Sequence, residues 1–211
     1  MSNEGQLSIG KILILVRHGE SVANVSGILS SGLDRYPLTN EGREQAERTA
    51  AKIENIEIDN FYTSPVLRAL ETAEIISEHI GIRPEVSPLL VERNFGKLEE
   101  WNFGTRAALE RQSIVQIENN YPDMEPWKGI EARMEKFVKG TKEGISLAVT
   151  HMDPIKALLS VILERDEAEM RGVNPGNASI TAVDLRRKGF DSVLCIGSHF
   201  LPEALLKDSV K

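Results

Sequence analysis

The sequence has one cysteine, no surplus of basic residues and no long hydrophobic run. A single cysteine, Cys195, cannot form an internal disulfide, and this favours a reducing compartment. Cys195 lies in the apolar stretch 192–196, which indicates a buried strand residue rather than a nucleophile. The first ten residues are polar, and the apolar run after them is too short for a signal sequence or a membrane span. We therefore expect a cytoplasmic protein with no membrane partner.

The charge balance restricts the class of ligand. A formal net charge of -7 disfavours a general nucleic-acid binder, because such proteins need surplus basic residues. A small phosphorylated ligand remains compatible, since one concave site can be positive on an acidic protein. The 4 histidines are scattered and form no paired ligand motif, so the sequence predicts no metal site.

Composition and patterning favour a single α/β domain over residues 1–211. Hydrophobic residues make up 41% and charged residues 27%, which is typical of a globular protein, and no internal repeat or low-complexity segment interrupts the chain. Apolar strands are expected at 11–16, 61–63, 144–150, 179–185 and 192–197. Their alternation with helices predicts a three-layer fold, in which a mostly parallel sheet carries helices on both faces.

The expected helices have recognisable ends. Thr39 is placed as the N-cap of a helix over 39–55. Ser64 and Pro65 are interpreted as the N-cap and first position of the next helix, which Gly81 closes. The segment after the 144–150 strand is apolar on nearly every side and predicts a buried helix. Residues 88–140 fit the strand–helix rhythm poorly and are interpreted as an inserted helical cap.

The tripeptide Arg17-His18-Gly19 directly follows the first apolar strand. An arginine offers a planar fork of donors that matches pairs of phosphate oxygens. A neutral imidazole can attack phosphorus, and its protonation is adjustable near neutral pH. A glycine removes the side chain where backbone passes close to a ligand. Taken alone, the tripeptide is only suggestive of a phosphate site.

Other strand ends strengthen this interpretation. Ser64 follows the second strand with Arg68 one helical turn later, and His151 follows the 144–150 strand. Ligands of open parallel sheets bind beyond the carboxyl ends of the strands. Two arginines and two histidines are therefore expected at one edge, where they match a phosphoryl group in charge and donor geometry.

At this point the chain resembles the histidine phosphatase superfamily, which includes cofactor-dependent phosphoglycerate mutases. Five motifs occur in the family's order, and they are Arg17-His18-Gly19-Glu20-Ser21 with Asn24, Pro37-Leu38-Thr39 with Gly42 and Gln45-Ala46, Ser64-Pro65-Val66-Leu67-Arg68, Glu92-Arg93-Asn94-Phe95-Gly96, and Val149-Thr150-His151. The resemblance implies metal-independent phosphoryl transfer through a phosphohistidine. It implies catalytic roles for Arg17, His18, Arg68, Glu92 and His151, with Glu92 as the proton donor.

The resemblance also implies substrate contacts from Asn24, and we add Gly19 and Met152 to the substrate-binding candidates. Two departures from the family pattern affect the substrate rather than the chemistry. Met152 and Asp153 stand where the family commonly has a glycine, and Asp153 is expected either as an N-cap before Pro154 or as a partner for a donor on the substrate. The stretch 98–101 replaces a common Glu-Gly and changes the pocket wall.

Three functions remain open. The first is a phosphomonoesterase acting on a small phosphorylated metabolite, since a relatively short insertion leaves the site accessible to water. The second is a phosphoglycerate mutase, which needs 2,3-bisphosphoglycerate as a primer and no other cofactor; Arg93, Arg106 and Arg111 are then candidates to hold a substrate carboxylate. The third is a non-catalytic phospho-ligand or protein-binding module, which retention of all the catalytic groups disfavours. The substrate and the choice between a monomer and a homodimer stay open.

Overall fold

The structure is a computed structural model that describes residues 11–101, 112–202 and 205. Its centre is a six-stranded sheet with the order β3-β2-β4-β1-β5-β6. The strands are Lys11–Arg17 (β1), Asn60–Thr63 (β2), Glu85–Val86 (β3), Gly144–Thr150 (β4), Ile180–Asp184 (β5) and Val193–Ser198 (β6). The strands β1 to β4 are parallel, whereas β5 is antiparallel to β1 and β6. The expected mostly parallel sheet is confirmed, and the short β3 is an addition to it.

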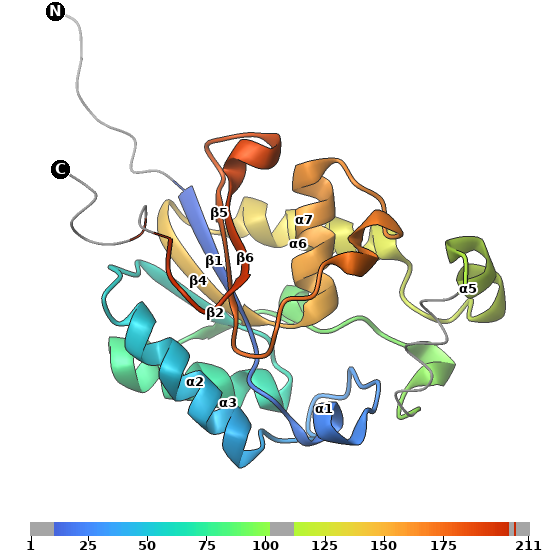
Figure 1. Cartoon of the computed structure of the whole chain (residues 1–211), viewed down its shortest axis with the longest axis horizontal. Helices are drawn as coiled ribbons and strands as arrows, with labels where there is room; N and C mark the ends of the chain where they lie inside the picture. The colour runs from blue at the N-terminus through green and yellow to red at the C-terminus, as the bar shows by residue number, and fades with distance from the viewer. Residues whose placement is uncertain (1–10, 102–111, 203–204, 206–211) are drawn as a thin grey trace, which may run out of the picture.

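Both faces of the sheet are covered. Leu13 and Leu15 of β1 pack into one buried cluster, whereas Ile14 and Val16 pack into the other. This explains the unbroken apolar run, because successive side chains enter opposite cores. Figure 1 shows α2 and α3 on one side of the sheet and α6 and α7 on the other. These helices are Asn40–Ile53 (α2), Leu67–Ile80 (α3), Trp127–Gly140 (α6) and Met152–Leu163 (α7). The three-layer α/β architecture is confirmed.

The helix ends agree with the sequence in one case and differ in another. Thr39 caps α2, because its Oγ1 accepts from the Gly42 N–H at 3.0 Å, an interaction whose loss costs about 1 kcal/mol. The expected N-cap at Ser64 is wrong, since α3 begins at Leu67 with Val66 as its N-cap. Ser64 is instead kept in the loop, where its hydroxyl accepts from the Val66 N–H at 3.3 Å. The loop position frees Ser64 for the site described below.

The segment expected as an inserted cap has two parts. Its second part, α6, lies in the layer that covers the sheet, and its buried side chains join the same cluster as Leu13 and α7. Its first part, as far as it is described, consists of short helices. Leu90, in the first of them, joins the same cluster as α6, whereas the other two contribute to a separate buried cluster of Leu29, Phe95, Leu98, Ile117 and Met124. These short helices are Pro88–Leu90 (η1), Gly96–Leu98 (η2) and Ile114–Asn120 (α5). The boundaries of the cap and the single-domain organisation stay predictions.

The remaining short helices are Val22–Ser26 (α1), Glu169–Gly172 (η3) and Gly189–Ser192 (η4). The first of them directly follows the Arg17-His18-Gly19 strand end. In the part of the chain that the structure describes, no helix has both the length and the apolar content needed to cross a bilayer.

Candidate active site

Three parallel strands end side by side and deliver polar residues to one edge of the sheet. Arg17 of β1 pairs with Thr150 of β4, and Thr63 of β2 pairs with Val149 of β4. His18, His151 and Ser64 follow these strand ends, so this register places them together. The structure therefore brings together the three strand ends that the sequence singled out.

His18 is held as one neutral tautomer. Its Nδ1 lies 2.7 Å from the Gly19 carbonyl oxygen, which can only accept, so Nδ1 carries the proton. Its Nε2 lies 3.0 Å from Nε of Arg68 and accepts from that N–H. Burial, followed by the charges of Arg68 and Arg17, lowers the pKa of His18 well below its ordinary value. The ring therefore stays neutral at pH 7 with the lone pair on Nε2.

His151 lies directly beside His18. The centroids of the two rings are 5.1 Å apart, and Nε2 of His151 is 2.8 Å from the Ser64 hydroxyl. His151 is fully buried, and burial together with the charge of Arg68 lowers its pKa well below the ordinary value. Two neutral imidazoles and a hydroxyl consequently form the wall of the site next to the two arginines.

The two arginines are buried at the same edge. Arg68 is 3% exposed, and its Nη2 donates to the Ser30 carbonyl at 2.9 Å. Burial lowers the pKa of Arg68, while the carboxylates of Glu92 and Glu99 oppose that shift. Arg17 donates from Nη1 to the Pro175 carbonyl at 2.7 Å. Backbone carbonyls thus orient both guanidinium groups towards the site.

Two buried nitrogen atoms of this cluster lack a hydrogen-bond partner within the described residues. They are Nη1 of Arg68 and Nδ1 of His151. Nearly all buried polar atoms in folded proteins are hydrogen-bonded, so such exceptions indicate a place for a ligand. Nη1 is a cationic donor and can bond only to an acceptor, which a phosphoryl oxygen supplies.

Glu92 approaches the cluster from the segment that follows η1. It is 7% exposed, and its Oε1 accepts from the backbone N–H of Arg93 at 2.9 Å and of Asp153 at 3.3 Å. The second of these bonds ties Glu92 to the first turn of α7, just after His151. This placement brings the expected proton donor to the same edge as His18.

Asn24 has a well-defined amide orientation. Its Oδ1 accepts from Ser21 N at 3.0 Å and from Asn177 Nδ2 at 3.2 Å. Because the oxygen is used in this way, the other end of the amide, the NH₂ donor, is the end available to a ligand. A contact from Asn24 to phosphate stays a prediction. So does the contact from Met152, which begins α7 next to His151.

The structure gives a different reason for Gly19 from the expected ligand contact. A Cβ on Gly19 would lie 2.3 Å from the Gly42 carbonyl oxygen, and one on Gly42 would lie 1.9 Å from the Glu20 oxygen. The two glycines therefore let the start of α2 pack against the backbone that follows His18. A direct substrate contact from Gly19 stays a prediction.

Asn177 was missed by the sequence reasoning. Its Nδ2 donates to the His18 carbonyl at 3.1 Å as well as to Asn24, and the Ala178 N–H also donates to the His18 carbonyl at 3.1 Å. Ala178 has a left-handed φ of 51°, and the Thr49 hydroxyl bonds to its carbonyl. The available signal was the turn-rich stretch 174–177 in front of β5. Because β5 is antiparallel, its beginning rather than its end lies at the active edge.

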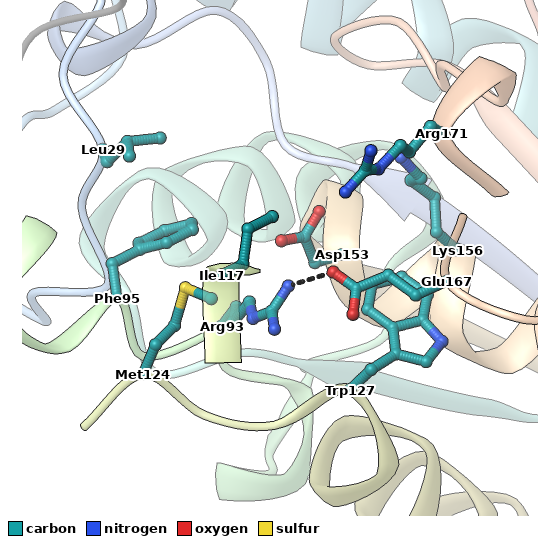
Figure 2. A pocket seen from close by; sticks show the side chains of 10 residues that line it. All are labelled: Leu29, Arg93, Phe95, Ile117, Met124, Trp127, Asp153, Lys156, Glu167 and Arg171. Atoms are coloured by element: carbon teal, nitrogen blue, oxygen red, sulfur yellow. Dashed lines mark hydrogen bonds and ion pairs between the residues drawn. The ribbon is translucent and has the colours of Figure 1, made fainter. Parts of the chain in front are cut away.

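A cavity adjoins this cluster (Figure 2). Its lining includes Arg93, which directly follows Glu92, and Asp153, which lies two residues after His151. The expected N-cap role of Asp153 is wrong, since His151 is the N-cap and Asp153 lies inside the first turn of α7. Arg93 forms an ion pair with Glu167 at 2.7 Å. The other two arginines proposed for a substrate carboxylate, Arg106 and Arg111, lie outside the described residues.

The fold and the convergent histidines and arginines define a phosphoryl-transfer enzyme. A family model described as histidine phosphatase superfamily (branch 1) matches residues 13–196, and the chain belongs to this superfamily. Its members are phosphatases or phosphoglycerate mutases, so the expectation of an enzyme rather than a non-catalytic binding module is confirmed. The superfamily is generally independent of metal ions.

Individual relatives extend over nearly the whole chain. The 2,3-bisphosphoglycerate-dependent phosphoglycerate mutase of Thermoplasma acidophilum is 36% identical over 199 residues, or 93% of this chain and 97% of that protein. The solved structure of TTHB049 from Thermus thermophilus is 30% identical with a TM-score of 0.64 and covers 88% of this chain and 98% of its own. The solved structure of YhfR from Bacillus stearothermophilus is 25% identical with a TM-score of 0.75 and covers 90% of this chain and 98% of its own.

Proposed function

We propose that the protein hydrolyses a small phosphomonoester through a phosphohistidine on His18. The observation that carries this proposal is the neutral tautomer of His18, whose Nε2 lone pair points at the Arg68 guanidinium. A phosphoryl group bound by Arg68 therefore meets the nucleophilic nitrogen directly. The buried Nη1 of Arg68 and Nδ1 of His151 supply further polar contacts, with Arg17 adding positive charge.

In the first step, the Nε2 lone pair of His18 attacks phosphorus in line with the leaving oxygen. The N–P bond forms as the P–O bond to the leaving group breaks, and Glu92 gives its proton to that oxygen. Two backbone N–H groups donate to Oε1 of Glu92 and orient its carboxyl group at the site. Arg17, Arg68, His151 and Asn24 stabilise the non-bridging oxygens, which is most of what phosphoryl transfer requires.

In the second step, the Glu92 carboxylate takes a proton from water as the water oxygen attacks phosphorus. The N–P bond breaks, its electron pair returns to Nε2 of His18, and inorganic phosphate leaves. Glu92 is then protonated again and His18 is neutral, so the enzyme returns to its starting state.

A phosphoglycerate mutase is the second candidate, and the relative from Thermoplasma acidophilum favours it. In that reaction the acceptor is a hydroxyl of a phosphoglycerate, and 2,3-bisphosphoglycerate primes His18. We place hydrolysis first because the inserted segment expected at 88–140 is relatively short, which favours access of water to the site. A mutase needs the phosphoenzyme to be protected from water.

One assay separates these candidates. The protein is incubated with 3-phosphoglycerate, with and without 2,3-bisphosphoglycerate, while inorganic phosphate and 2-phosphoglycerate are both followed. Release of phosphate without the primer supports hydrolysis. Primer-dependent formation of 2-phosphoglycerate with little phosphate identifies a mutase and contradicts the first proposal.

We also propose that catalysis needs no metal ion, because two arginines supply the positive charge at the phosphoryl group. Activity on p-nitrophenyl phosphate should be unchanged after dialysis against EDTA. Loss of activity that Mg²⁺ or Zn²⁺ restores would contradict this part of the mechanism. A cytoplasmic location is part of the same proposal, in keeping with the free thiol of Cys195, whose pKa burial raises.

A further inference from the structure

Ser64 is buried in the loop that joins β2 to α3, and backbone contacts fix its position. Its N–H donates to the Val149 carbonyl at 2.9 Å, and its own carbonyl accepts from the Thr63 hydroxyl at 3.2 Å. Its side-chain oxygen lies 3.3 Å from the Val66 nitrogen and 2.8 Å from Nε2 of His151. Ser64 therefore has a fixed place next to the buried ring of His151.

The direction of the hydrogen bond between Ser64 and His151 follows from the partners of the hydroxyl. The Val66 N–H can only donate, so the Ser64 oxygen accepts from it. The hydroxyl proton needs an acceptor because the group is buried, and within the described part of the chain Nε2 of His151 is the acceptor in reach. The opposite direction, from Nε2–H to the oxygen, would leave the hydroxyl proton unmatched among those residues. Ser64 is therefore the donor.

This direction determines which nitrogen of His151 carries a proton. Nε2 accepts and is unprotonated, and the ring is neutral at pH 7 because burial, followed by the charge of Arg68, lowers the pKa of His151. Its one N–H is therefore at Nδ1. Nδ1 is also the nitrogen that has no hydrogen-bond partner within residues 11–101, 112–202 and 205. This buried atom is consequently a donor, and a phosphoryl oxygen is a suitable acceptor for it.

His18 and His151 are thus the same tautomer and present opposite ends to the site. His18 donates its Nδ1–H to the Gly19 carbonyl and presents the lone pair of Nε2. His151 uses its Nε2 lone pair to accept from Ser64 and presents Nδ1–H. One ring can attack phosphorus, and the other can donate to the oxygens around it. In its other tautomer, His151 would present a lone pair, which repels an anionic oxygen.

We propose that Ser64 is a positioning residue, which holds His151 as the Nδ1–H tautomer so that this ring donates to a non-bridging phosphoryl oxygen. The inference rests on the proposed function, because it takes the phosphoryl group to be bound at His18. His151 keeps its proton through both steps of the reaction. Its role is therefore to donate a hydrogen bond to the developing charge, and no proton is transferred.

NMR of the ring nitrogens reads the tautomer directly. Protein labelled with ¹⁵N in its histidines is examined at pH 7.5, and the His151 signals are assigned by their absence in His151→Asn. Protonated and unprotonated ring nitrogens have well-separated chemical shifts. We expect wild-type His151 to have a protonated Nδ1 and an unprotonated Nε2. In Ser64→Ala no hydroxyl donates to Nε2, so the Nε2–H tautomer should become populated.

Activity should follow the tautomer. In Ser64→Ala, kcat/KM on p-nitrophenyl phosphate and the affinity for vanadate, which resembles the five-coordinate transition state, should both fall about 10- to 100-fold. Ser64→Thr keeps the hydroxyl and should restore the Nδ1–H tautomer together with most of the activity. Ser146→Ala is the matched control, since Ser146 is a buried serine near the opposite end of β4, and it should change neither measurement.

A wild-type His151 with its proton on Nε2 would overturn the inference, and this measurement needs no variant to fold. So would a Ser64→Ala protein that keeps the Nδ1–H tautomer, or one whose tautomer changes while vanadate affinity and activity do not. The proposed function has its own readout in the wild-type phosphoenzyme. If no phosphohistidine forms while the tautomer and vanadate binding depend on Ser64, the positioning role stands and the covalent mechanism falls.

Discussion

The catalytic edge and the neighbouring cavity are built in different ways. Catalytic candidates at the edge follow the ends of β1, β2 and β4, whose register the sheet determines. The cavity is lined from α5, α6, α7, the loops of the cap and the segment around η3. A sheet edge positions reacting groups rigidly, whereas helices and loops can change their side chains without disturbing it. From this difference we propose that the strand ends carry the chemistry and that the cavity contributes to specificity.

The largest expected effect comes from a substitution at the catalytic edge that leaves the cavity unchanged. His18→Ala removes the nucleophile and should lower kcat/KM by at least about a thousandfold for every phosphomonoester. His79→Ala is the matched control, since His79 lies on α3 at the surface and contacts Glu47 and Glu54. Steady-state kinetics on p-nitrophenyl phosphate check both. A His18→Ala protein that keeps more than about a hundredth of wild-type activity would contradict a nucleophilic role.

Glu92→Gln should give the next largest effect, and the effect should depend on the leaving group. The amide keeps the shape of the side chain but cannot donate the proton. We expect kcat to fall about 10²- to 10⁴-fold on alkyl phosphates and much less on p-nitrophenyl phosphate, whose leaving group needs little protonation. Equal losses on both substrates would move the acid role away from Glu92, with Asp153 as the next residue to test.

Asn177→Ala tests the part of the edge that does not follow a parallel strand. Without its amide, the His18 carbonyl and Asn24 each lose a donor, and we expect kcat/KM to fall about 10- to 100-fold through misplacement of the reacting groups. Asn174→Ala, at an exposed position of the same loop, serves as the control. If Asn177 acts partly through Asn24, its loss should be smaller in an Asn24→Ala background. If the losses in kcat/KM from Asn177→Ala and Asn24→Ala simply multiply in the double variant, Asn177 acts independently of Asn24.

The smallest expected effect concerns pH and stability. Burial lowers the pKa of His18 and His151, so below about pH 6.5 the unfolded chain binds more protons than the folded protein. The free energy of unfolding should therefore fall as pH drops below 6.5, by up to about 1.4 kcal/mol per pH unit for each histidine. Urea titrations at pH 7.5, 6 and 5 measure this slope.

His151→Ala provides the check on that slope. In this variant the free energy of unfolding should decrease less steeply below pH 6.5, because one buried neutral histidine has been removed. His79 has the opposite sign, since hydrogen bonds to Glu47 and Glu54 raise its pKa and its contribution is lost as pH rises. Its exposure makes that contribution small. An unchanged slope in His151→Ala would show that this histidine is not kept neutral by burial.

The sheet and the strand-end residues could be predicted because their signals are local. The run 12–16 is apolar at every position since alternate side chains enter opposite cores, and Arg17 and His18 follow it directly. Composition also contributed, since a single cysteine rules out an internal disulfide and a net charge of -7 disfavours a general nucleic-acid binder. The first turn of α3 was misplaced because Ser64 and Pro65 resemble a cap, although the chain begins the helix at Leu67.

The rest depends on tertiary structure. Asn177 lies at the site because β5 runs antiparallel, and nothing local in 180–184 shows the direction of that strand. The close approach of Gly19 and Gly42 joins two segments that are distant in sequence. The ion pair between Arg93 and Glu167 in the cavity wall likewise joins two segments that are distant in sequence.

Trapping the phosphoenzyme tests the central claim most directly. Wild-type protein is incubated briefly with a phosphomonoester, quenched, and examined by mass spectrometry for a phosphoryl group that is lost in acid and stable in base, the pattern of a phosphoramidate. The account predicts such a group on His18, absent in His18→Ala and accumulating in Glu92→Gln with p-nitrophenyl phosphate, because water is then not activated. An acid-stable phosphoserine, or a phosphoryl group on another histidine, would contradict it.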